Sequence, residues 1–164
     1  MSNQTPIKAV VVTISDSRGE KDDLSGVTLV GLLLAAGAEV VDKIIISDEP
    51  EKIVETLREH SEREDVNLIL TTGGTGLAPR DNTPEATRAV IEKEVPGIAE
   101  AMRVGTLSKT PMAMLSRGVC GARGKCLIIN LPGSPNGARE CFEIVKPVLP
   151  HAVNLLAGAS EHNK

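Results

Sequence analysis

The sequence predicts a single three-layer α/β/α domain over residues 1–164, with a mostly parallel sheet at its centre. Three observations support this fold class. Runs of β-branched, nearly continuously apolar residues alternate with segments of helical periodicity, as in a sheet that helices cover on both faces. The expected strands end in polar or glycine-rich loops, and residues typical of helix caps precede the expected helices. A chain of 164 residues is also long enough to bury about 70% of its unfolded surface in one core.

The first half of the chain supplies three of the expected strands and two helices. We predict strands over residues 7–14, about 39–46 and 66–72. Ser25 is the expected cap of a helix that runs from Val27 to Leu34 and stops at Gly37. This helix is apolar around most of its circumference, so we expect it to be sandwiched between layers or to lie partly at a subunit interface. A second helix follows Asp48, with glutamates along its solvent side.

The second half of the chain predicts four more elements. Thr83, Pro84 and Glu85 have the order of an N-cap, a first helical residue and an acid at the positive end of a helix. We also expect a helix over about 97–107, an irregular stretch over 108–126 that can hold an antiparallel hairpin, and a strand over 126–131. Ser134 then caps helices that reach about residue 156, interrupted at Pro147 or Pro150.

Polar or glycine-rich residues follow four of the predicted strands. They are Ser15-Asp16, Asp48, Gly73 to Asp81, and Gly133-Ser134. If these strands are parallel, their carboxyl ends meet at one edge of the sheet, where open α/β sheets bind ligands. The sequence therefore predicts one site built from four loops.

The loop after the third strand is the strongest of these signals. Glycine has no Cβ, so Gly73, Gly74 and Gly76, with Thr75 between them, can expose backbone N–H groups to a ligand. An Arg80-Asp81 pair and a helix start follow, an order that suits an anionic, phosphate-bearing ligand. A plain strand-to-helix turn is the simpler alternative. The loop is neither a P-loop nor the GxGxxG fingerprint of dinucleotide-binding proteins.

Structural alternatives remain open for several of these residues. Asp48 can simply cap its helix, and Ser134 can be a cap, a phosphate ligand or both. Asp16 can form a surface ion pair with Arg18. The charged residues 18–23 are typical of a solvated loop, and Arg123 with Lys125 of a charged turn.

Composition excludes several classes of function. The net charge is −4 and Phe142 is the only aromatic residue, so we expect no nucleic-acid partner. Cys120, Cys126 and Cys141 lack metal-ligand spacing and are expected to be buried and reduced, and the three histidines are scattered, so no zinc site is predicted. No signal peptide or apolar run of the ~18 residues needed for a membrane span is found. We expect a cytoplasmic protein without a membrane partner.

Three collinear segments resemble the molybdopterin adenylyltransferases, the MogA/MoaB family that includes the G domain of gephyrin. They are TISDS, GGTGLAPRDNTPEAT and MLSRGVCGARGKCLIINLPGSP, and the resemblance extends from about Ile7 to Leu156. It implies a MogA/MoaB-like fold and transfer of AMP from ATP to the terminal phosphate of molybdopterin, with Mg²⁺ and release of pyrophosphate. It also implies a homotrimer, or a hexamer as in some members, that passes its product to a separate molybdenum-inserting enzyme.

The resemblance also assigns residues. Asp48 and Asp81 match the catalytic aspartates and are the expected Mg²⁺ ligands. The residues expected to bind the substrates are Ser15, Asp16, Gly73, Gly74, Thr75, Gly76, Arg80, Ser116, Gly133 and Ser134. Arg80 can bind phosphate or hold a carboxylate. Asn82 departs from the valine common in the family, and the loop over residues 18–24 differs from that of many members.

Two other functions are considered. The first is a catalytically silent molybdopterin-binding or delivery protein of the MoaB type, but the intact Arg80-Asp81 pair favours a working enzyme. The second, an unrelated nucleotide-binding regulator, has little support because no effector module is visible. The near absence of aromatic residues means that a pterin or adenine ring would have to rest on aliphatic side chains and peptide planes.

Overall fold

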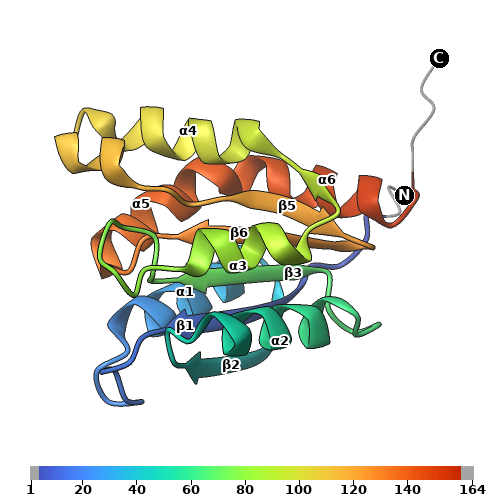
Figure 1. Ribbon diagram of the computed structural model, residues 1–164. Coiled ribbons are helices and arrows are strands. Elements are labelled where there is room, and N and C mark those ends of the chain that lie inside the picture. Colours follow the sequence, from blue (N-terminus) through green and yellow to red (C-terminus); the bar gives the residue numbers. More distant parts are fainter. Residues whose placement is uncertain (1–3, 160–164) are drawn as a thin grey trace.

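One six-stranded sheet forms the centre of the molecule in the computed structural model, which describes residues 4–159 (Figure 1). The strand order is β2-β1-β3-β6-β5-β4. The strands are β1 (Lys8–Ile14), β2 (Glu39–Ile46), β3 (Leu68–Thr72), β4 (Lys93–Glu94), β5 (Cys120–Arg123) and β6 (Cys126–Leu131). β1, β2, β3 and β6 are parallel, whereas β5 is antiparallel to both of its neighbours. The predicted, mostly parallel sheet is confirmed.

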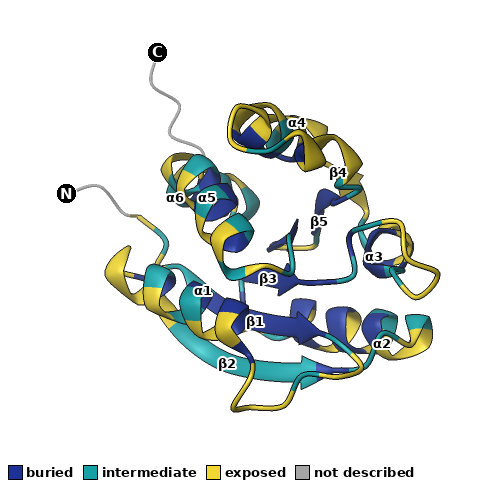
Figure 2. Cartoon of the chain, turned by 90° about the vertical axis from the view of Figure 1, so that its left-hand side faces the viewer, coloured by how far each residue is buried: buried dark blue, intermediate teal, exposed yellow. Residues whose placement is uncertain are grey.

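Helices cover both faces of this sheet (Figure 2). They are α1 (Leu24–Ala35), α2 (Pro50–Ser61), α3 (Thr83–Val90), α4 (Pro96–Leu107), α5 (Pro135–Val145) and α6 (Leu149–Leu156). Two short 3₁₀ helices, η1 (Pro111–Leu115) and η2 (Lys146–Val148), complete the chain. α1, α4, α5 and the start of α6 pack on one face, and α2 and α3 pack on the other. The three-layer arrangement is therefore also confirmed.

The alternation of side chains along the central strands explains why their sequences are almost continuously apolar. In β1, Ala9 and Val11 belong to the core under α1 and α5, whereas Val10 and Val12 belong to the core under α2 and α3. A strand that is covered on both faces has no polar side, so it shows no polar alternation.

The second half of the chain contains the predicted hairpin and the predicted helix interruption. β5 and β6 form the hairpin, and Gly124 at its turn has a positive φ of 55°. The interruption is η2, which contains Pro147. Two short elements, β4 and η1, were not expected. β4 has only two residues and pairs at the edge of the sheet, so it leaves no pattern in the sequence.

Two of the predicted helix caps were wrong. Asp23, not Ser25, caps α1, because its carboxylate accepts the N–H of Gly26 at 3.1 Å. The hydroxyl of Ser25 accepts a hydrogen bond from Arg18 instead. At α3 the N-cap is Asn82, and Thr83 is the first helical residue. In both places a contact with a residue far along the chain decides where the hydroxyl points.

Other expectations about single residues are confirmed. Ser134 caps α5 and accepts the N–H of Gly137 at 3.1 Å. The three cysteines are free and buried, and burial raises the pKa of the Cys120 thiol to about 12. Within residues 4–159 no helix has the length and apolar character needed to cross a bilayer.

Candidate functional site

The loops that follow β1, β2, β3 and β6 meet at one edge of the sheet, as predicted. The N–H of Ser15 donates to the carbonyl of Ile46 at 2.9 Å, and the N–H of Gly73 donates to the carbonyl of Leu131 at 3.2 Å. These bonds extend the parallel ladders past the strand ends and join the loops to one another. The grouping follows from parallel pairing, because parallel strands place all their carboxyl ends together.

The glycine loop after β3 requires glycine at two positions. Gly73 and Gly74 have positive φ angles of 103° and 67°, which other residues rarely adopt. A Cβ on Gly73 would lie 2.3 Å from the carbonyl oxygen of Ile14, and one on Gly74 would lie 2.2 Å from the hydroxyl of Thr83. That hydroxyl donates to the carbonyl of Gly73 at 3.0 Å, so Thr83 fixes the loop to α3 instead of capping the helix.

Three consecutive N–H groups of this loop are free to bind a ligand. Within residues 4–159, the amides of Gly74, Thr75 and Gly76 donate to no protein acceptor. Successive amides of this kind are a common feature of anion sites, because each carries a partial positive charge. The loop is therefore more than a tight turn.

Asp48 lies beside this loop and faces the loop after β1. Its carboxylate accepts the N–H of Asp16 at 2.9 Å, and its own N–H donates to the carboxylate of Asp16 at 3.0 Å. The interpretation of Asp48 as a helix cap is wrong, since Glu49 is the N-cap of α2. Burial, followed by the negative charges of Asp16 and Asp81, raises the pKa of Asp48.

Arg80 holds Asp16, not Asp81. Its Nε and Nη2 donate to the carboxylate of Asp16 at 2.5 and 3.0 Å, and Nη2 also donates to Glu49 at 2.9 Å. These bonds from Arg80, followed by the N–H of Asp48, lower the pKa of Asp16. The expected ion pair of Asp16 with Arg18 was therefore wrong. Glu49 was not anticipated, although its position directly after Asp48 was a signal.

Asp81 turns back onto its own loop. Its Oδ2 accepts the N–H of Ala78 at 3.0 Å, and its N–H donates to the carbonyl of Ala78 at 2.9 Å. The same Oδ2 would lie 2.8 Å from a Cβ on Gly76, so the carboxylate is packed against the glycine loop. Asp48 and Asp81 thus flank this loop.

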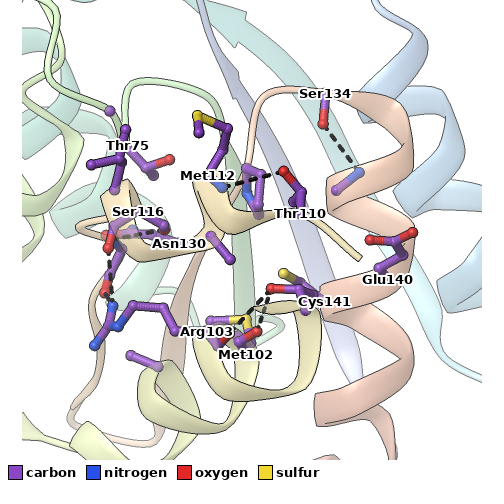
Figure 3. A pocket seen from close by; sticks show the side chains of 18 residues that line it. Thr75, Met102, Arg103, Thr110, Met112, Ser116, Asn130, Ser134, Glu140 and Cys141 are labelled. Atoms are coloured by element: carbon purple, nitrogen blue, oxygen red, sulfur yellow. Dashed lines mark hydrogen bonds between the residues drawn. The ribbon is translucent and has the colours of Figure 1, made fainter. Parts of the chain in front are cut away.

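A cleft of about 250 Å³ opens on the other side of the glycine loop, between α4, η1 and α5 (Figure 3). Four of the predicted residues line it: Thr75, Gly76, Ser116 and Ser134. Met102 and Arg103 of α4, Met112 of η1 and Glu140 of α5 also line it and were not predicted. The sequence offered no signal for Met112, because η1 lies in the stretch that was interpreted as irregular.

The remaining predicted residues lie outside the cleft. The hydroxyl of Ser15 accepts the N–H groups of Ser17 and Arg18, so it stabilises the loop after β1. A Cβ on Gly133 would lie 3.3 Å from the Cα of Gly73, so Gly133 allows the loops after β3 and β6 to approach. The structure therefore divides the predicted residues into a carboxylate side, a glycine loop and a cleft side.

Asn130 was missed, although a polar residue inside an apolar strand was a visible signal. Its side chain is buried in β6 and accepts the N–H of Val119 at 3.1 Å. Its amide donates to the hydroxyls of Thr71 and Thr87 at 3.0 and 2.9 Å. Asn130 therefore joins β3, α3 and the segment before β5 beneath the floor of the cleft.

Comparisons with known proteins agree on one family. The family profile described as "Probable molybdopterin binding domain" matches residues 10–151. The molybdenum cofactor synthesis protein cinnamon of Drosophila melanogaster is 45% identical over 150 residues, which are 89% of this chain and 25% of that protein. The molybdopterin adenylyltransferase of Helicobacter pylori strain J99 is 42% identical over 152 residues, which are 90% of this chain and 86% of the relative. The solved structure of the molybdopterin biosynthesis enzyme MoaB from Thermus thermophilus matches with a TM-score of 0.86 and 52% identity, over 93% of this chain and 97% of that one.

Proposed function

Because this chain belongs to the family of the probable molybdopterin binding domain, we propose that it is a molybdopterin adenylyltransferase of molybdenum cofactor biosynthesis. The relative from Helicobacter pylori carries that name, and the two chains align over most of their lengths. The observation that carries the proposal is the position of the glycine loop. Its three free N–H groups lie between the carboxylates of Asp48 and Asp81 on one side and the cleft on the other.

The proposed reaction joins two anionic substrates. A terminal phosphate oxygen of molybdopterin attacks the α-phosphorus of ATP, a new phosphorus–oxygen bond forms, and the bond to the β-phosphate oxygen breaks. Pyrophosphate leaves with that electron pair. The protein has to align the two groups and offset their charge. The free amides of the glycine loop and the N-terminus of α5 at Ser134 supply fixed partial positive charge for this purpose.

The carboxylates fit a magnesium ion that the substrates help to bind. Oδ2 of Asp48 and Oδ2 of Asp81 accept backbone N–H groups, which leaves the second oxygen of each for a ligand. No group of three or more acidic, histidine or cysteine side chains within residues 4–159 is arranged to hold a metal. Two carboxylates suit Mg²⁺, which is usually bound by one or two carboxylates together with substrate phosphates. When bound there, Mg²⁺ would offset phosphate charge during the transfer.

The exposed face of α1 supports the proposal of a homotrimer. Leu24, Val27 and Leu34 are 63%, 56% and 56% exposed, whereas Leu29 and Leu33 are buried against the sheet. An apolar face of this kind is typical of an interface between subunits. Sedimentation should give the mass of three chains, and a monomer at micromolar concentration would contradict the proposal. We also propose that the protein acts in the cytoplasm and passes its product to a molybdenum-inserting enzyme.

The test of the function is a reaction with purified components. The protein is incubated with molybdopterin, ATP and Mg²⁺, and adenylyl-molybdopterin and pyrophosphate are measured together. We expect both products in equal amounts and neither product when Mg²⁺ is replaced by a chelator. A delivery protein without catalytic activity would instead bind molybdopterin and release no pyrophosphate, which would overturn the proposal.

A further inference from the structure

Arg117 makes three contacts with the segment that carries Asp81. It lies between η1 and β5, and its side chain is about one third exposed. Its Nε donates to the carbonyl of Gly76 at 2.9 Å and its Nη2 donates to the carbonyl of Asp81 at 2.7 Å, while Nη1 forms an ion pair with Glu85. One side chain thus spans the glycine loop, Asp81 and the first turn of α3.

The backbone of Arg117 is joined to the same loop. Its N–H donates to the carbonyl of Thr75 at 2.9 Å. The residues on each side are held from the cleft, because Nη1 of Arg103 donates to the carbonyl of Gly118 at 3.1 Å and lies 3.4 Å from that of Ser116. Arg103 and Ser116 both line the cleft (Figure 3). A continuous set of contacts therefore connects the wall of the cleft to the main chain of Asp81.

The chemistry of the guanidinium group explains why arginine suits this place. Its N–H donors lie in one plane with fixed directions, so it can bind several acceptors at once and fix their relative positions. A lysine ammonium is a point charge on a flexible stem and cannot reproduce that fork. The hydrogen bond from Arg117 also lowers the pKa of Glu85, which keeps the ion pair charged.

We propose that Arg117 is a positioning residue for the proposed AMP transfer: it fixes the main chain at Gly76 and Asp81 so that the carboxylate of Asp81 is held beside the glycine loop. The inference rests on the proposed function, since Asp81 matters only if phosphate chemistry occurs there. Arg117 acts through hydrogen bonds to two carbonyls, and its fork is occupied by protein acceptors. The fork geometry, more than the charge, is what the loop requires.

The test compares Arg117→Lys and Arg117→Gln with a control, Arg88→Gln. Arg88 is an exposed arginine on α3 near Arg117, and within residues 4–159 its side chain donates no hydrogen bond and forms no ion pair. Misplacing a catalytic group by about 1 Å can cost about 100-fold in rate. We therefore expect kcat for pyrophosphate release to fall at least about 10-fold in both Arg117 variants, with KM for ATP changed less than about threefold. A lysine variant with the kcat of wild type would show that only charge matters and would overturn the proposal.

Amide hydrogen exchange of the free protein gives a second measurement that needs no activity. The amides of Ala78 and Asp81 are the protected ones of the loop, because each donates a hydrogen bond there. We expect both to exchange faster in Arg117→Lys than in Arg88→Gln, with the same melting temperature in both variants. Equal exchange would overturn the role of Arg117. If the wild-type protein releases no pyrophosphate, the proposed function fails, and the exchange measurement still decides whether Arg117 fixes the loop.

Discussion

The carboxylate of Asp23 lies 2.8 Å from the ammonium group of Lys43, and this ion pair joins the start of α1 to β2. The side chain of Asp23 is fully buried, while that of Lys43 is 18% exposed. Burial alone would raise the pKa of Asp23, but hydrogen bonds from Lys43, Thr13 and the N–H of Gly26 outweigh it and lower the pKa. The pair therefore stabilises the segment that leads from β1, past Asp16, into α1.

We predict that Asp23→Ala lowers the free energy of unfolding at pH 7 by about 3 kcal/mol. This is the lower end of the cost of breaking a buried ion pair, because Lys43 keeps some contact with water. Urea unfolding measures the change. Glu20→Ala is the control, since Glu20 bonds the same lysine from a side chain that is 78% exposed and should cost less than about 1 kcal/mol. Equal losses in the two variants would contradict the role of burial.

The contribution of the Asp23 charge should also depend on pH. A carboxyl group whose pKa is lowered by folding stabilises the protein above its unfolded pKa of 3.8, and that stability is lost as the pH falls through the lower folded value. The difference in stability between wild type and Asp23→Ala should therefore shrink below about pH 4. A difference that stays constant between pH 7 and pH 3 would show that the charge of Asp23 contributes nothing.

Asp48→Asn should separate catalysis from stability. Burial and the charges of Asp16 and Asp81 raise the pKa of Asp48, so its ionised form is disfavoured in the folded protein. The asparagine oxygen can still accept the N–H of Asp16, so we expect no loss of stability at neutral pH. Turnover should fall by about 100-fold, the usual cost of losing one electrostatic group at a reacting centre. Wild-type turnover in the variant would leave Asp48 with a structural role only.

Asp81→Asn should abolish pyrophosphate release while molybdopterin still binds. The asparagine oxygen can keep the hydrogen bond to the N–H of Ala78, so the loop should stay folded. The charge that we propose as a magnesium ligand is lost. A single-turnover assay is compared with a molybdopterin titration of the same variant. Release at the wild-type rate would rule out the assignment, and loss of binding as well would indicate a collapsed loop.

Ser134 should act both as a cap and as a ligand, and two substitutions separate these roles. Ser134→Ala removes the hydrogen bond to Gly137 and should cost about 1 kcal/mol of stability, whereas Ser134→Gly should cost only a few tenths, because glycine is a good N-cap. Both variants lack the hydroxyl, whose bond to a charged phosphate is worth about 1.5–3 kcal/mol. Both should therefore bind molybdopterin or ATP more weakly. Unchanged affinity for both ligands would make Ser134 a cap alone.

Local patterns determined much of this protein before any contact was known. The four parallel strands, the glycine loop, the cap at Ser134 and the gathering of Asp48 with Asp81 at one edge depend on periodicity, backbone preference and the geometry of parallel sheets. Each of these depends on neighbours within a few residues or on a general rule of sheets. The sequence alone was therefore sufficient for them.

Only the tertiary structure decided which groups the charged and hydroxyl side chains meet. Arg80 binds Asp16, which is 64 positions away, and not the adjacent Asp81. The start of α1 was misplaced because Asp23 bonds Thr13 across the layer, and the cleft was missed because α4 and η1 reach it from outside the motifs. A polar side chain takes whichever partner the packed layers bring within about 3 Å. Spacing along the chain carries no record of that distance, so Arg117 and its carbonyl partners became visible only in the folded protein.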